Sequence, residues 1–207
     1  MVRRTKKEAE ATREAILEAA TKVFVCKGVA RASLEEIARQ AGVTRGAVYW
    51  HFKNKVDVFK ALYDQLYTPF SEMILKDLEQ DHPQPLEQLA ALCTNLFRDL
   101  PVNRHKKEVL TIFFLKCDYS GEMEAIRQHQ NERKQKSIEL FYEYFKRAQA
   151  KGHLPPDADP HVLTLSLLGY ITGLVYEYLR NPDVFDLERN ADPLIRNFFL
   201  GIAPAME

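Results

Sequence analysis

A cluster of hydrogen-bond donors between residues 44 and 55 is the chemistry that this sequence offers most clearly. The donors are hydroxyl groups, an imidazole and cations, in the order Thr44, Arg45, Tyr49, His51, Lys53 and Lys55. Gly46 and Ala47 add little bulk beside them, so another surface can approach closely. Such donors hold phosphate oxygens, and an arginine can also reach a base edge. The segment therefore suits nucleic-acid binding.

Two short helices joined by a tight turn are expected to position these donors. Ser33 and Glu36 form an S-x-x-E capping box, which predicts that the first helix begins at Leu34. Gly42 ends this helix, because glycine adopts the left-handed conformation at little cost. The apolar face of the helix recurs at three- and four-residue spacing and consists of Leu34, Ile37, Ala38 and Ala41.

The second helix is predicted from Arg45 to about His51, with Thr44 as its N-cap. A helix this short is not stable alone, so Val43, Val48 and Phe52 must hold it against its neighbour. The positive end of this helix attracts phosphate, as a helix that reads the major groove requires. Two helices around a glycine also occur in many helical proteins, so spacing alone leaves an ordinary packing motif open.

The full string VTRGAVYWHFKNK resembles the signature of the TetR/AcrR family of bacterial repressors, through its Thr-Arg-Gly-Ala, Tyr-x-His-Phe and Lys-Asn-Lys elements. The resemblance covers about residues 5–60. Beyond them it rests on the helical pattern and on a Phe-Leu-Lys-Cys-Asp run similar to the multidrug-efflux repressors of the family. It implies that Thr44, Tyr49, His51 and Lys55 hold phosphates and that Arg45 reaches bases. The predicted DNA-binding set is Ser33, Thr44, Arg45, Gly46, Ala47, Tyr49, His51, Lys53 and Lys55. Trp50 is expected to pack in the core.

Length and charge support a small module followed by a larger one. The chain has 207 residues, and we predict a helix-turn-helix domain at 1–55 and a ligand-binding and dimerisation domain at 56–207. The net charge is zero, yet residues 1–60 carry 13 Lys and Arg against 7 Asp and Glu, a net of +6, which leaves −6 for the rest. Arg3 and Arg4 belong either to an arm that reaches DNA or to a solvated tail.

Other classes of protein find little support in the composition. No run of about 18 apolar residues and no signal peptide is evident, so we expect a cytoplasmic protein without a membrane partner. The three cysteines and six histidines show no metal-ligand spacing, and no cofactor is expected. An all-helical enzyme is a remote alternative, with His129 and Glu177 as its acid–base pair, but no nucleophile arrangement or phosphate loop supports it.

The remaining pattern predicts an all-α fold of about nine helices. Besides the two above, helices are expected at about 6–27, 53–81, 86–101, 104–117, 122–151, 160–179 and 193–202. Pro69 should kink its helix near Tyr67 or Thr68. The bend is either a lever between the domains or a break without mechanical meaning.

Polar residues interrupt the apolar stripe of the helix at 122–151. Gln130, Arg133 and Ser137 either line a pocket or face solvent, because a buried donor needs a partner. The family resemblance implies a small hydrophobic inducer. The predicted contacts are Leu66, Phe70, Leu92, Leu96, Leu110, Phe114, Gln130, Arg133, Tyr170, Leu174 and Glu177.

Self-association is expected through the last two helices, near 160–179 and 193–203. The first is apolar nearly all round, and both start at an Asp-Pro pair, Asp159-Pro160 and Asp192-Pro193. A single monomeric core is the alternative. A homodimer would read a palindromic operator in double-stranded DNA. The resemblance favours control of an efflux operon, with a metabolic or signalling pathway as the alternative.

Overall fold

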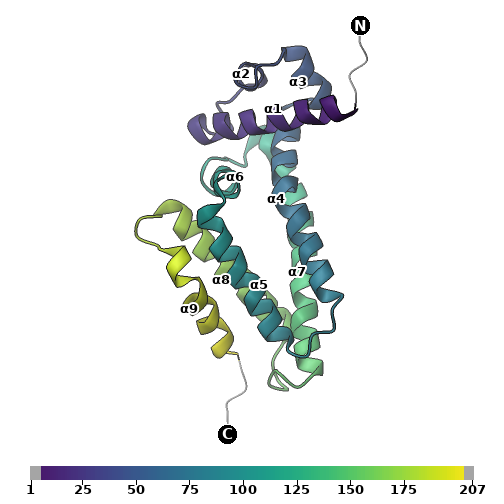
Figure 1. The fold of residues 1–207 in the computed structure, drawn as a ribbon, viewed down its shortest axis with the longest axis vertical. Coiled ribbons are helices and arrows are strands. Elements are labelled where there is room, and N and C mark those ends of the chain that lie inside the picture. The colour runs from purple at the N-terminus through teal and green to yellow at the C-terminus, as the bar shows by residue number, and fades with distance from the viewer. Residues whose placement is uncertain (1–5, 203–207) are drawn as a thin grey trace. The chain divides into compact units, whose positions relative to one another are not determined.

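Helices make up most of the described chain, residues 6–202, in a computed structural model of the protein (Figure 1). Within this range there are nine α-helices, one 3-10 turn and no strand, which confirms the predicted all-α class. The helices are α1 (Lys6–Lys27), α2 (Leu34–Gln40), α3 (Arg45–His51), α4 (Lys55–Leu78), α5 (Pro85–Val102), α6 (Arg104–Leu115), α7 (Glu124–Ala150), α8 (Pro160–Arg180) and α9 (Leu187–Leu200), with the turn at Gly121–Met123. Arg3 and Arg4 lie outside the described residues.

The chain divides into two packing units. The first contains α1 to α3, α4 up to Tyr67, and the segment Glu108–Asn131. The second contains Thr68–Lys107 and the chain from Glu132 onward. The predicted division between residues 55 and 56 stays a prediction, because the packing units follow shared cores rather than the order of the chain.

The first three helices form the bundle that holds the helix-turn-helix (Figure 1). Its core includes Ile16, Phe24, Ile37 and Val48, all of them fully buried. The capping box forms as predicted: Ser33 Oγ accepts from Glu36 N at 3.2 Å, and Glu36 Oε2 accepts from Ser33 N at 3.1 Å. The bounds predicted for α1, and the start and end predicted for α3, are confirmed.

The turn between α2 and α3 depends on Gly42. Its φ is +66°, in the region that side-chain-bearing residues rarely adopt. This conformation lets Gly42 N donate to Arg39 O at 3.2 Å and Val43 N donate to Ala38 O at 3.0 Å, which satisfies the last carbonyls of α2. The turn therefore fixes where α3 begins.

Residues far along the chain complete the first unit. Val29 N donates to Lys116 O at 3.0 Å, just after α6. Phe113 of α6 packs edge-on against Phe59 of α4, with ring centroids 4.5 Å apart. Tyr119 Oη donates to Phe113 O at 2.9 Å and accepts from Gln130 Nε2 at 2.9 Å. The half-buried amide of Gln130, one of the predicted stripe interruptions, thus has a partner within its own unit.

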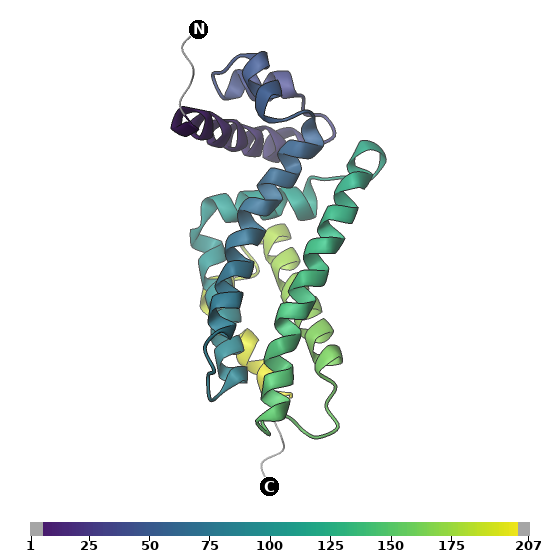
Figure 2. The same cartoon turned by 90° about the vertical axis from the view of Figure 1, so that its right-hand side faces the viewer.

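The second unit joins the latter part of α4 to that of α7, which run side by side (Figure 2). Tyr144 Oη donates to Asp77 Oδ2 at 2.6 Å, and an Arg147 nitrogen donates to Leu78 O at 2.5 Å. Burial, and then the hydrogen bond to the Asp77 carboxylate, raise the pKa of Tyr144. On another side of the unit, Arg98 of α5 pairs with Asp192 of α9 at 2.5 Å.

The predicted start of the last helix at Asp192-Pro193 is wrong. Helix α9 begins at Leu187, and its N-cap is Asp186, whose side chain accepts from Arg189 N at 2.9 Å. The helix starts earlier because its buried face begins before Asp192: Leu187, Ala191 and Ile195 recur every fourth residue and are all buried. Pro193 is exposed inside the helix, where it removes a single donor at the solvent side.

Two other expectations concern long apolar helices. Helix α4 contains Pro69 within its bounds, and the predicted bend near Tyr67 or Thr68 stays a prediction.

Among the described residues one helix, α8, is long and apolar enough to cross a membrane, and 33% of its most apolar stretch is buried. The statement that no such stretch exists was therefore wrong. Length and composition are weak evidence for a membrane span, because the core helix of a soluble protein passes the same test.

The capping box gives a testable prediction about the stability of the bundle. Ser33→Ala removes the side-chain acceptor for Glu36 N and should lower the free energy of unfolding by about 1 kcal/mol. Denaturant unfolding followed by circular dichroism measures the change. Ser120→Ala is the matched control, because Ser120 precedes a helical turn without a side-chain cap bond and should change little. Equal losses in the two variants would contradict the assignment.

Candidate nucleic-acid interface

The amino end of α3 is built to be approached from outside. Thr44 Oγ1 accepts from Ala47 N at 3.2 Å, which fixes the first turn of the helix. A Cβ added at Gly46 would meet no atom of the chain closer than Thr44 Oγ1 at 3.9 Å. Packing within the chain therefore does not require glycine at this position. The smallness of Gly46 leaves room for another molecule.

Arg45, the first residue of α3, is held by two neighbours although it is exposed. Its Nε lies 3.2 Å from Glu35 Oε1, and an Nη donates to Tyr49 Oη at 3.4 Å. The guanidinium also lies over the Tyr49 ring, 5.2 Å from the centroid. The hydrogen bond to Tyr49, and then the attraction of Glu35, raise the pKa of Arg45 above its ordinary value. The side chain therefore presents a permanent positive charge.

Two other predicted cations differ in their surroundings. Lys53 follows α3 and is exposed. Lys55 Nζ donates to Val29 O at 3.2 Å and to Ala30 O at 3.0 Å, so it ties the start of α4 to the turn after α1. Lys55 thus stabilises the bundle, whereas no hydrogen bond or ion pair of the described residues engages the Lys53 ammonium.

The structure places the predicted DNA-binding residues on α3 and just before and after it, except Ser33, which caps α2. Thr44, Arg45, Gly46, Tyr49 and Lys53 are exposed, while Ser33, Ala47, His51 and Lys55 are half-buried. The oxygen of Ser33 is engaged in the capping box, which makes its role at least partly structural.

The expectation that Trp50 packs in the core was wrong. Its side chain is 72% exposed, and its ring lies perpendicular to that of His51, at 4.5 Å between centroids. Val48 and Phe52 take the buried positions on either side of it. An indole left in water on a helix this small needs a reason outside the chain.

The residues predicted to contact an inducer divide between the two units. Leu66, Leu110, Phe114 and Gln130 belong to the first unit, and Phe70, Leu92, Leu96, Arg133, Tyr170, Leu174 and Glu177 to the second. Within the second unit, Tyr170 Oη donates to Leu194 O at 2.9 Å and its ring lies against Phe198. Glu177 is exposed and pairs with Arg180 at 3.5 Å. The ligand set stays a prediction.

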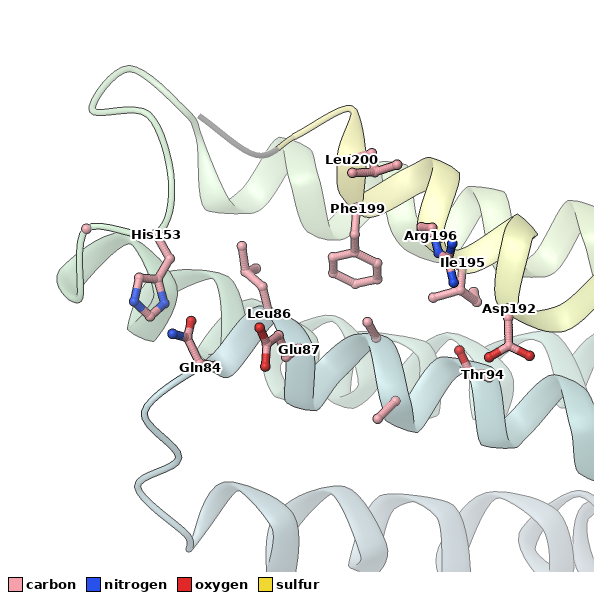
Figure 3. Close-up of a pocket in the computed structure, with 13 residues that line it drawn as sticks. Gln84, Leu86, Glu87, Thr94, His153, Asp192, Ile195, Arg196, Phe199 and Leu200 are labelled. Carbon is pink, nitrogen blue, oxygen red and sulfur yellow. The ribbon is translucent and has the colours of Figure 1, made fainter. Parts of the chain in front are cut away.

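A hollow of about 700 Å³ opens between α5 and α9 in the second unit (Figure 3). Leu86, Ile195 and Phe199 supply apolar lining, and Figure 3 shows the Phe199 ring directed toward α5. His153 lies at one end, where its Nδ1 is buried without a hydrogen-bond partner in the described chain. None of the predicted ligand residues lines this hollow.

Comparison with known proteins identifies the family. Residues 16–62 match the bacterial regulatory proteins of the tetR family, and residues 84–202 match the C-terminal region of MAATS-type transcriptional repressors. The second match alone covers more than half of the chain. This chain is a transcriptional regulator of the TetR family.

Three relatives illustrate the similarity of this TetR-family regulator to other bacterial regulators. The transcriptional regulator TtgR of Pseudomonas putida is 36% identical over 190 residues, which cover 90% of this chain and 89% of TtgR. NalD, the secondary repressor of the MexAB-OprM multidrug efflux pump in Pseudomonas aeruginosa, is 36% identical with a TM-score of 0.85, over 95% of this chain and 99% of NalD.

The third relative was solved with a small molecule. It is the complex of triclosan with SmeT, the repressor of the SmeDEF multidrug efflux pump of Stenotrophomonas maltophilia. This structure is 29% identical, has a TM-score of 0.86, and covers 94% of this chain and 93% of that chain. The relatives are transcriptional regulators, so the enzyme alternative no longer applies to this TetR-family regulator.

Sequence reasoning missed two features of the interface. The exposure of Trp50 was missed because an aromatic residue inside a helix was assumed to be buried, although the period that buries Val48 and Phe52 places residue 50 on the other side. The Glu35–Arg45 pair was missed because it joins two helices, and sequence spacing does not reveal which residues meet across a turn.

The two lysines give a prediction that separates binding from folding. Lys53→Ala should weaken binding to any duplex and reduce the slope of log affinity against log salt by about 1, without changing stability. Lys55→Ala should weaken binding too, and should also lower the free energy of unfolding by about 1 kcal/mol, because two carbonyl contacts are lost. Fluorescence anisotropy at several salt concentrations and denaturant unfolding measure both. Lys134→Ala, an exposed position on α7, is the control. Identical behaviour of the first two variants would refute the distinction.

Proposed function

We propose that this TetR-family regulator is a repressor that binds a palindromic operator and is released from it by a small hydrophobic ligand, and that it controls a multidrug efflux operon. The observation that carries the proposal is the exposed surface of α3. Arg45 and Tyr49 of this helix, and Lys53 just after it, are exposed, and the small Gly46 lies in its first turn. NalD and SmeT are repressors of multidrug efflux pumps, which supports the efflux target. The likeness to bacterial transcriptional regulators supports a cytoplasmic location.

Repressors of this family bind operator DNA as dimers. Half-sites in DNA lie about 34–36 Å apart or a multiple of this, so two copies of α3 must be held at a fixed separation. We propose that α8 and α9 make this dimer, as expected from residues 160–179 and 193–203. Val162 and Leu165 of α8 are 56% and 45% exposed, and Leu200 of α9 is exposed as well.

Two glycines of α8 support the same surface. A Cβ added at Gly169 or Gly173 would meet nothing within 4 Å, so the chain's own packing does not select glycine at either position. Glycine inside a helix costs roughly 1 kcal/mol relative to alanine. Since both glycines are exposed and one turn apart, close approach of a second helix is the reason that fits them.

A hydrophobic inducer releases the protein from DNA if it binds one geometry of the dimer more tightly than the DNA-binding geometry. The difference between the two binding free energies is about 1–3 kcal/mol for a typical allosteric effect. In the second unit we propose Phe70, Leu92, Leu96, Arg133, Tyr170, Leu174 and Glu177 as its contacts. The complex of SmeT with triclosan, an aromatic compound, supports this class of ligand. Leu66, Leu110, Phe114 and Gln130 remain predicted contacts in the first unit.

The experiment that tests the proposal is a gel shift with the DNA upstream of the protein's own gene and of neighbouring transporter genes. A specific shift that survives excess random duplex supports the repressor. Its reversal by triclosan or another small hydrophobic compound supports the inducer. Absence of any specific shift at modest ionic strength would overturn the proposal.

Arg45 gives a prediction about sequence preference. Arg45→Ala should lower affinity for the operator by about tenfold or more and affect random DNA much less, because an arginine that pairs with guanine discriminates by roughly 1–3 kcal/mol. Anisotropy titrations with operator and random duplexes measure the two affinities. Equal losses on both duplexes would show that Arg45 contacts phosphate alone.

The dimer surface gives a further prediction. Gly173→Glu should leave the fold of the subunit intact, because the position is open, and should shift the protein from dimer toward monomer. Sedimentation velocity over a range of concentrations measures the shift, and operator binding should fall in parallel. Gln135→Glu, at an exposed position of α7, is the control. A dimer as tight as that of the unchanged protein would remove α8 from the interface.

A further inference from the structure

The acidic residue that contacts Arg45 is unexpected at a surface meant for DNA. Glu35 is the second residue of α2, and its carboxylate lies 3.2 Å from Arg45 Nε. The side chains of Arg45 and Glu35 are 66% and 46% exposed, so their ion pair contributes little to folding. The capping box of α2 uses Glu36 rather than Glu35. A carboxylate in the first turn of α2 is favourable at the positive helix end, but this effect does not require its contact with Arg45.

The geometry of the pair shows what it does to the arginine. A guanidinium has five N–H groups arranged in a planar fork. Glu35 engages Nε, and Tyr49 Oη accepts from Nη2 at 3.4 Å, so these two contacts lie along one edge of the fork. The Tyr49 ring supports the plane from one side, 5.2 Å from the centroid. The outer edge, formed by Nη1 and the second hydrogen of Nη2, meets no partner in the described chain.

That outer edge can bind a guanine base. Guanine presents two acceptors in the major groove, O6 and N7, and an arginine binds both with two parallel N–H groups. A free arginine must give up several rotamers to reach this arrangement, and Lys or Arg in general loses much of its freedom on binding. Here Glu35 and Tyr49 restrict the side chain before DNA arrives, and they leave the reading edge open.

The charge of Glu35 acts in the same direction. Binding to random DNA comes from neutralised phosphates, and a carboxylate beside the main base-reading cation opposes it. A contact that repels wrong partners raises specificity even when it lowers affinity for all of them. This repulsion acts on both duplexes, so the difference between them comes from Arg45: held by Glu35, it is less able to turn to a phosphate of random DNA, whereas it reaches a guanine of the correct sequence from the same position.

We propose that Glu35 is a specificity-determining residue, which positions Arg45 for a guanine and lowers the affinity of the protein for random DNA. The inference rests on the proposed function, since it requires that α3 reads an operator. It predicts that Glu35 changes the ratio of specific to random affinity through Arg45, and that the rest of the half-site is read without it.

The experiment uses the full-length protein and two duplexes of equal length: the sequence enriched from a randomised pool by the unchanged protein, and a random sequence. Affinities are measured for the unchanged protein and for Glu35→Gln, Arg45→Ala and the double variant. Glu35→Gln should reduce the specificity ratio about three- to tenfold, mainly through tighter binding to the random duplex. In the Arg45→Ala background, Glu35→Gln should leave the ratio unchanged.

A scan of single-base substitutions in the enriched half-site locates the effect. Glu35→Gln should flatten preference only at the base pair where Arg45→Ala flattens it. Glu35→Asp keeps the charge but shortens the side chain, so it should flatten the same base pair while affinity for the random duplex stays constant. Glu18→Gln, which removes an exposed carboxylate of α1 paired with Lys22, is the matched control and should leave the ratio unchanged.

Each remaining outcome separates the two claims. If the unchanged protein enriches no sequence, the proposed function fails and this inference fails with it. If it enriches one but Glu35→Gln leaves the ratio unchanged or raises it, the repressor assignment stands and the role of Glu35 is wrong. The same holds if Glu35→Gln alters the ratio equally with and without Arg45, because Glu35 would then act as a general charge alone.

Discussion

The burial of a few apolar side chains under α3 is the constraint on which the interface depends. This helix has seven residues and could not persist alone in water. Val48 and Phe52 are buried against α1 and α2, and Gly42 and Thr44 fix the point where the helix begins. With one side anchored in this way, the exposed side chains of α3, Arg45, Tyr49 and Trp50, can be used for contacts outside the chain.

Local signals in the sequence were sufficient to predict helix ends wherever a capping residue or a glycine fixes the end. The capping box at Ser33, the left-handed Gly42 and the N-cap Thr44 act within a few residues, so α2 and α3 could be predicted almost to the residue. The start of α9 could not, because an equally good Asp-Pro signal lies inside that helix. Its true start depends on Leu187 and Ala191 packing against a helix distant in sequence.

Features that join separate elements were beyond sequence reasoning for the same physical reason. Period alone tells which side of α3 is buried, but it does not show that Glu35 of α2 meets Arg45, or that Lys55 reaches the carbonyls of Val29 and Ala30. These contacts depend on how helices cross. They also change what each predicted residue does: Lys55 binds two carbonyl oxygens of its own chain, whereas Arg45 is held by Glu35 and Tyr49 and stays exposed.

Three helical glycines connect the interface to the dimer surface. Gly46, Gly169 and Gly173 lie where a side chain would meet no close atom of this chain, and glycine lowers helix stability at each of them. A residue that weakens its own helix without helping internal packing is best explained by a partner that comes close. Donors surround Gly46, which suits a nucleic acid at α3, and exposed Val162 and Leu165 precede the glycines of α8, which suits the apolar partner proposed there. On the proposed function, glycines that open a helix surface would serve both contacts, and the neighbouring side chains would decide which partner each surface accepts.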